Sequence, residues 1–233
     1  MRRSTLRRVL LNGARYVREH GWRGYFEQMA SSAVDRWYEW RLGIDTSGST
    51  TAGPSPDRPD DVDYVPIPYA LLRRALGKLP IHSDSCFLDY GAGRGRVLVT
   101  AATMPFRRVI GVEISSELVE DARRNLASAK RLACADITLV TRDAATFDVP
   151  DEVDVMHFFK PFRGKLLERV IDKIEESYRR APRRITLIFF NDQEFREVVA
   201  HRRWLERTDG GVALGRTRWP ITWGIYSTRS EGG

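Results

Sequence analysis

Three acidic residues and a glycine-rich segment stand at the ends of successive apolar runs. In the segment FLDYGAGRGRVLV, Asp89 closes an apolar run and three alternating glycines follow it. Glu113 ends the next apolar run, and Asp143 follows the third. Carboxylates accept hydrogen bonds from hydroxyls and amines, while backbone N–H groups at the start of a helix favour an anion. The pattern predicts a site for a donor-rich ligand that carries a ribose, an amino-bearing base and an anionic group.

The three glycines need an explanation of their own. A tight strand-to-helix turn explains one glycine, whereas each further one costs roughly 0.5–1 kcal/mol relative to Ala. We therefore expect a ligand to approach the backbone at Gly91, Gly93 and Gly95. A dinucleotide-binding loop has the spacing G-x-G-x-x-G, and here Arg96 stands where its last glycine would be. A nicotinamide-dependent oxidoreductase is therefore an alternative that fits the fold but not this spacing.

Alternating strand and helix patterns predict the elements that position these residues. The expected strands are Ser85–Tyr90, Arg108–Glu113, Ile137–Arg142, Val153–Phe159 and Arg184–Phe190; the expected helices are Arg96–Thr103, Ser116–Arg131, Gly164–Tyr178 and Gln193–Arg202. Near-continuous apolar runs such as RVIGVE and ITLIFF are typical of parallel strands that are buried on both faces. The terminal segment WPITWGIYST adds one or two strands, as a hairpin. The sequence thus predicts an α/β fold with a doubly wound, mostly parallel sheet, whose ligands bind beyond the carboxyl ends of the strands.

The first third of the chain predicts a helical extension and a linker before this domain. Residues 1–46 are basic and aromatic-rich, with one helix expected at Leu6–Val17 and a second from Trp22 onward. Residues 47–61 are rich in Gly, Ser, Thr, Pro and Asp and are expected to form a flexible linker, followed by the main domain at 62–233. The aromatic residues of the second helix recur at helical spacing. We expect this stripe to pack on its own domain. The first helix carries Arg on several faces, which leaves a position on a membrane surface as the alternative.

Composition narrows the class of protein. The 233 residues are 42% hydrophobic and 30% charged, and the net charge of +7 is concentrated in residues 1–46, which hold nine Arg and five acidic residues. The rest of the chain is nearly balanced and has no basic run or aromatic RNA-binding motif, so RNA is a possible but not a favoured partner. The two cysteines, Cys86 and Cys134, have no metal-binding spacing, and no metal is expected. No apolar run approaches a membrane span, and we expect a cytoplasmic protein.

Four segments together resemble a known family. FLDYGAGRGRVLV, VIGVEIS, RDAATF and VDVMHFFKPF are similar, in order and spacing, to the cofactor motifs of class I, Rossmann-like methyltransferases that use S-adenosylmethionine (SAM). The resemblance covers about residues 64–228. It implies the sheet order 3-2-1-4-5-7-6 with an antiparallel seventh strand, SAM as cofactor, and catalysis by in-line methyl transfer.

The resemblance also implies a role for each motif residue. Asp89 and the backbone of Gly91, Ala92, Gly93 and Gly95 would hold the methionine end of SAM. Glu113 would bind the ribose hydroxyls, and Ile114 would pack on the adenine. Asp143 and the amide of Ala144 would contact the adenine edge. Tyr64 and Phe159 complete the expected cofactor contacts, with Tyr64 closing over the ligand.

The fourth motif departs from the pattern of amino-group methyltransferases. In the segment FFKPF, Lys160 stands where Asn or Asp would hold the accepting nitrogen. Lys160 is the candidate catalytic residue, a base for an acceptor that must lose a proton, while His157 is expected to be a packed core residue. A cation beside the sulfonium favours a small-molecule or protein-borne acceptor with an oxygen or carboxylate over a cationic amine. An RNA methyltransferase and a non-catalytic SAM-fold binding protein remain alternatives.

Overall fold

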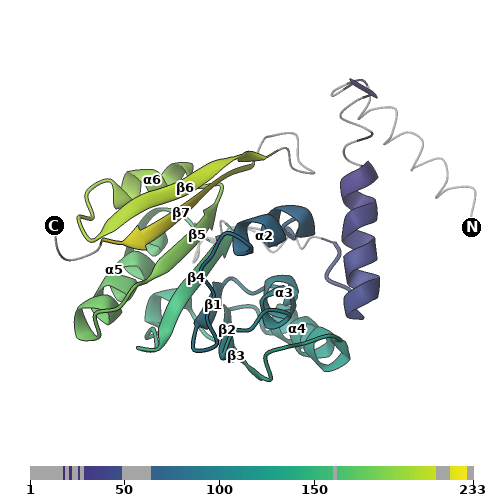
Figure 1. The fold of residues 1–233 in the computed structure, drawn as a ribbon, viewed down its shortest axis with the longest axis horizontal. Coiled ribbons are helices and arrows are strands. Elements are labelled where there is room, and N and C mark those ends of the chain that lie inside the picture. The colour runs from purple at the N-terminus through teal and green to yellow at the C-terminus, as the bar shows by residue number, and fades with distance from the viewer. Residues whose placement is uncertain are drawn as a thin grey trace, which may run out of the picture.

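A seven-stranded sheet forms the centre of the structure, a computed structural model that describes residues 18, 21–22, 26, 29–48, 64–159, 162–213 and 221–229 (Figure 1). The strands are β1 (Cys86–Tyr90), β2 (Arg108–Glu113), β3 (Asp136–Thr141), β4 (Val153–Phe159), β5 (Thr186–Phe190), β6 (Leu205–Ala213) and β7 (Ile221–Thr228). Their order is β3-β2-β1-β4-β5-β7-β6. The strands from β3 to β5 pair in parallel, and β7 is antiparallel to both β5 and β6. The predicted doubly wound sheet is confirmed. The expected hairpin is found in part: the segment WPITWGIYST supplies only β7, and its partner β6 begins earlier, at Leu205.

Helices cover both faces of this sheet (Figure 1). They are α2 (Tyr69–Leu76), α3 (Arg96–Ala102), α4 (Ser116–Ser128), the short 3₁₀ helix η1 (Ala144–Thr146), α5 (Gly164–Arg180) and α6 (Gln193–Val199). Apolar side chains of α5 and α6 form one core with the sheet, and those of α2 and α3 form a second core on the other face. Strands β1 and β5 are buried along their whole length because they lie between these layers.

A further helix, over residues 29–42, stands beside α2 and α3 and is coloured purple in Figure 1. Tyr38 of this helix stacks on Tyr69 of α2, with ring centroids 5.2 Å apart. The chain after it remains attached to the domain, because Asp45 N donates to Asn125 Oδ1 of α4 at 2.9 Å. The helix expected at Leu6–Val17 and most of the linker expected at 47–61 lie outside the described residues. No helix among the described residues has the length and apolar character needed to cross a membrane.

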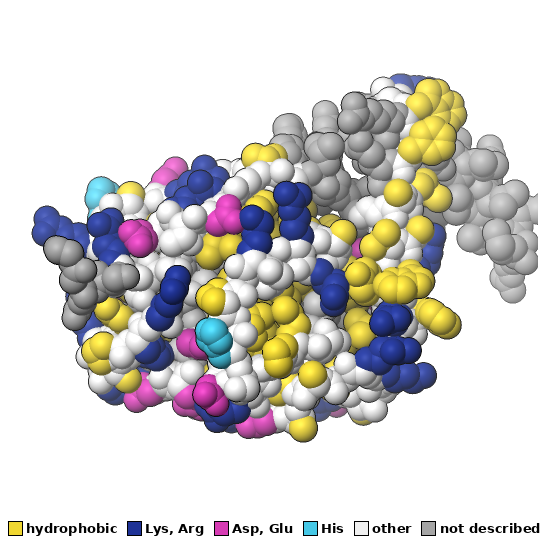
Figure 2. All heavy atoms as spheres, viewed as in Figure 1, with side chains coloured by type: hydrophobic (Ala, Val, Ile, Leu, Met, Phe, Trp, Pro, Cys, Tyr) yellow, Lys and Arg dark blue, Asp and Glu magenta, His cyan; other side chains and the backbone are white. Residues whose placement is uncertain are grey.

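The aromatic stripe of this N-terminal segment faces solvent. Trp22, Phe26 and Trp40 are 66%, 64% and 79% exposed, and Met29 and Trp37 are exposed too. Figure 2 shows their region as a line of hydrophobic side chains along the helix. The expectation that the stripe packs on its own domain is therefore wrong for these residues. The helix packs through a different face, which is described below.

Candidate active site

The glycine segment forms a loop between β1 and α3, at the carboxyl edge of the sheet. Gly91, Gly93 and Gly95 have φ angles of 75°, 52° and 84°, a left-handed conformation that favours glycine. The expectation that a turn accounts for only one of them is therefore wrong. Gly93 has a second constraint, because a Cβ there would lie 2.3 Å from Cε2 of Tyr64. The ring of Tyr64 thus covers the loop at Gly93. The left-handed backbone conformation is by itself a sufficient reason for all three glycines.

Glu113, at the end of β2, fastens this loop to the neighbouring strand. Its Oε2 accepts from the Gly93 N–H at 2.9 Å, and its Oε1 accepts from the N–H groups of Ile114 and Ser115 at 2.8 and 3.0 Å. The side chain is buried. A carboxylate has about four lone-pair sites, so three protein donors leave room for one more from a ligand. The sequence suggested a ligand contact at Glu113 and did not indicate this structural role.

Asp89 lies within β1 and pairs with His157 of β4. The distance from His157 Nδ1 to Asp89 Oδ1 is 2.7 Å, and both side chains are about 1% exposed. The imidazole also packs near the rings of Phe87 and Phe190, so the prediction of a packed core histidine is confirmed. The sequence did not indicate the hydrogen bond between His157 and Asp89. Among the described residues, the second carboxylate oxygen of Asp89 and Nε2 of His157 have no hydrogen-bond partner.

The Asp89–His157 pair leads to a stability prediction. We expect His157→Leu to lower the free energy of unfolding by about 1–3 kcal/mol or more, because the buried carboxylate loses its donor. Urea unfolding measures this difference. The matched control is His201→Leu, an exposed histidine, whose effect should stay within about 0.5 kcal/mol. Equal small effects of the two variants would contradict the role of the pair.

The other predicted site residues lie at the same edge of the sheet. Asp143 follows β3 and caps η1, where its Oδ1 accepts from the Ala145 N–H at 2.9 Å. Ala144, the first residue of η1, and Ile114 are half-buried, Ala92 is buried and Gly91 is exposed. Phe159 is the last residue of β4 and packs edge-on against Phe190. Lys160 lies outside the described residues. The fold thus brings the described candidates to the ends of neighbouring strands, while their contacts with a cofactor stay predictions.

Arg96 joins the glycine loop to the N-terminal helix. Its guanidinium lies 3.1 Å from Asp35 Oδ2 and 2.9 Å from Glu39 Oε1, and it donates to Thr46 Oγ1 at 2.7 Å and Ile67 O at 2.8 Å. Arg96, Asp35 and Glu39 are all buried. The helix therefore packs through its acidic face. Because Arg96 directly follows Gly95, this ion pair holds the N-terminal helix against the first turn of α3.

Tyr64 and Arg94 add contacts between the loop and the N-terminal segment. The Tyr64 hydroxyl donates to Thr46 O at 2.9 Å, and an Arg94 guanidinium N–H donates to Ser47 O. Burial raises the pKa of the Tyr64 hydroxyl well above its usual range. Tyr64 is therefore protonated at neutral pH and is not placed to act as a general base.

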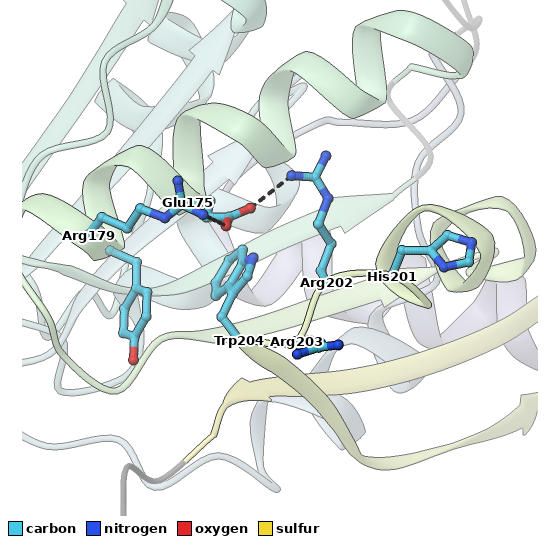
Figure 3. Close-up of a pocket in the computed structure, with 7 residues that line it drawn as sticks. Glu175, Arg179, His201, Arg202, Arg203 and Trp204 are labelled. Atoms are coloured by element: carbon cyan, nitrogen blue, oxygen red, sulfur yellow. Dashed lines mark hydrogen bonds and ion pairs between the residues drawn. The ribbon is translucent and has the colours of Figure 1, made fainter.

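A concave region lies between the end of α5 and the start of β6 (Figure 3). Two of its three arginines are paired: Arg202 with Asp172 and Glu175, and Arg179 with Glu175. Nearby, Arg183 donates to the carbonyl of Val153, the first residue of β4. This pocket is therefore at the amino edge of the strands, away from the glycine loop. In the described part of the chain, no group of three His, Cys, Asp or Glu side chains is placed to hold a metal.

Two sequence comparisons bear on this edge of the sheet. A family model described as "Methyltransferase domain" matches residues 87–180, which include β1 to β4, the glycine loop and Glu113. A protein-lysine N-methyltransferase from Saccharolobus islandicus (strain REY15A) is 36% identical over 66 residues, which are 28% of this chain and 41% of that protein. The similarity thus spans less than half of the length of that relative.

Solved structures with the same architecture include several named as methyltransferases. An RNA methyltransferase from Salinibacter ruber, in complex with S-adenosyl-L-homocysteine (SAH), has a TM-score of 0.52 at 20% identity and covers 72% of this chain and 97% of its own. Precorrin-6y C5,15-methyltransferase from Geobacter metallireducens has a TM-score of 0.52 at 20% identity, covering 69% and 88%. At these identities the similarity concerns the fold.

Proposed function

We propose that the chain is a SAM-dependent methyltransferase of the class I, Rossmann-like kind and that it transfers the methyl group of SAM to a protein acceptor, because a methyltransferase-domain model matches residues 87–180 and the fold is that of methyltransferases of this class. The observation that carries the proposal is the convergence at one sheet edge of the glycine loop, Asp89, Glu113 and Asp143. SAM, when bound, supplies a methyl group on a sulfonium that is already a good leaving group. The protein must chiefly position the two reactants, a contribution of roughly 7–11 kcal/mol in favourable cases.

The residues of this edge fit such a cofactor. The unpartnered Oδ2 of buried Asp89 is an acceptor suited to an ammonium group or to an N–H donor. Glu113 retains acceptor capacity beside the loop, which suits ribose hydroxyls. Ile114 and Asp143, at the ends of β2 and β3, would contact the adenine. Tyr64, already lying on Gly93, would bound the site on the side of the N-terminal segment.

We propose a lysine side chain as the acceptor. The support is the 36% identity of part of the chain to a protein named as a protein-lysine N-methyltransferase. An acceptor ammonium must lose a proton before its nitrogen can attack, and Lys160, two residues before buried Phe162, is the candidate base. The second candidate acceptor is an oxygen or carboxylate, which the charge of Lys160 favours over a cationic amine.

Labelled SAM and a cell extract test the acceptor. We expect label from the methyl group mainly in the protein fraction, on a bond that survives mild base, as methyl-lysine does. Label on protein that is lost in mild base would indicate a carboxyl ester and refute the lysine acceptor. Label mainly in RNA or in small molecules would contradict a protein acceptor.

Variants of Lys160 test its part in the transfer. We expect Lys160→Met to lower turnover at least tenfold, or ~1.4 kcal/mol in activation free energy, with the affinity for SAH nearly unchanged. The matched control is Lys165→Met, an exposed lysine at the start of α5, which should keep full turnover. If Lys160→Met and Lys165→Met turn over equally fast, Lys160 is not the base.

A further inference from the structure

The helix over residues 29–42 buries charged side chains and leaves its largest apolar side chains exposed, although Leu42 is buried and Tyr38 half-buried. Its buried side carries Asp35 and Glu39, which are bonded to Arg96. Met29, Trp37 and Trp40, at positions spaced by eight and three residues, share the opposite, solvent-exposed side. Surface helices normally bury their apolar side. The domain therefore leaves exposed the side of the helix whose apolar side chains would be stabilised most by burial.

The exposed charges that border this aromatic face are cationic. The two described acidic residues of the helix, Asp35 and Glu39, are buried and paired with Arg96, so neither is among the exposed charges of the helix. Arg36 and Arg41 are exposed, and the guanidinium of Arg41 lies 5.3 Å from the centroid of the Trp37 ring. The outer surface of the helix therefore combines aromatic side chains with positive charge. In the sequence, residues 1–46 as a whole hold nine Arg against five acids.

We propose that this face, formed by Met29, Trp37 and Trp40 with Arg36 and Arg41, docks on an anionic lipid surface. Tryptophan is enriched where membrane meets water, and helices that lie in this interface carry aromatic residues on one side with Arg or Lys beside them. A dimer interface of the obligate kind would instead be expected to resemble a protein core. The proposal goes beyond the methyltransferase activity. Arg96 connects the docked helix to the glycine loop, so the candidate active site lies close to the surface that the helix occupies.

Co-sedimentation of the 233-residue chain with vesicles tests the proposal. We expect binding to vesicles that contain phosphatidylglycerol, and binding at least tenfold weaker to vesicles of phosphatidylcholine alone. Raising the salt concentration should weaken the binding, because it screens the charges of Arg36 and Arg41. Absence of binding to either kind of vesicle, or equal binding to both, would overturn the proposal of an anionic lipid surface.

Variants on the exposed face identify the contact. The double substitution Trp37→Ser/Trp40→Ser should lower vesicle affinity at least tenfold, and Arg36→Gln/Arg41→Gln should lower it mainly at low salt. Val212→Ser is the matched control, because Val212 is an exposed apolar residue on β6, and it should keep full binding. Circular dichroism of each variant checks that the fold is retained. A wild-type dimer that the Trp37→Ser/Trp40→Ser change dissociates, without vesicle binding, would assign the face to a second copy of the chain and refute the proposal.

Discussion

Replacing Arg96 with Leu is expected to lower the free energy of unfolding by about 3–5 kcal/mol, the range for breaking a buried ion pair by removing one partner. Arg96, Asp35 and Glu39 are all buried, so the substitution leaves two carboxylates without their cation. Arg96→Lys should restore little, because an ammonium cannot reproduce the fork of donors that reaches both acids. Urea unfolding measures each variant.

Two further variants make this test specific. Arg107→Leu removes an exposed arginine and should change stability by no more than about 0.5 kcal/mol. Adding Asp35→Asn and Glu39→Gln to Arg96→Leu should recover part of the loss, because the amides carry no charge and can still accept from the N–H groups of Tyr69 and Thr46. If Arg96→Leu costs no more than Arg107→Leu, the docking of the N-terminal helix described above is wrong.

SAH is expected to stabilise the protein by about 2.7 kcal/mol when its concentration is a hundred times the dissociation constant. Glu113→Gln should remove most of this gain. The same substitution should also lower the stability of the free protein by about 1–3 kcal/mol, because the side-chain amide of Gln must direct one of its N–H groups toward a backbone N–H. The reason is geometric: Glu113 accepts on one oxygen from Gly93 and on the other from Ile114 and Ser115.

Thermal unfolding with and without SAH separates the two effects of Glu113→Gln. Glu117→Gln, which alters an exposed acid in the first turn of α4, is the control and should keep the full gain. A Glu113→Gln protein that is less stable alone but gains as much from SAH as the wild type would leave Glu113 with its structural role only.

The sheet could be predicted because its strands are short apolar runs whose pattern depends on local sequence. The bounds of β2 and β4 agree with expectation, and β7 is antiparallel as expected. Strand β6, LERTDGGVA, is not an apolar run, and the sequence did not indicate it. The common edge at which Asp89, Glu113 and Asp143 lie follows from parallel strand order, since the carboxyl ends of such strands meet on one side.

The contacts that the sequence did not indicate join residues far apart in the chain. Arg96 could be read only as a departure from a glycine pattern, because its partners Asp35 and Glu39 lie some sixty residues earlier. The same pairing reverses the orientation of the N-terminal helix, whose aromatic spacing alone suggested a buried stripe. Likewise, the bonds of Glu113 to Gly93 and of Asp89 to His157 depend on strand neighbours that no local pattern identifies.

Calorimetric titration of the 233-residue chain with SAH, and separately with NAD, tests the central claim most directly. The loop has a G-x-G-x-G spacing, and Arg96, which follows it, is ion-paired with Asp35 of the N-terminal helix. The fold is that of class I methyltransferases. We expect SAH to bind at one site per chain and NAD to give no measurable heat of binding. Binding of NAD without binding of SAH would contradict the assignment.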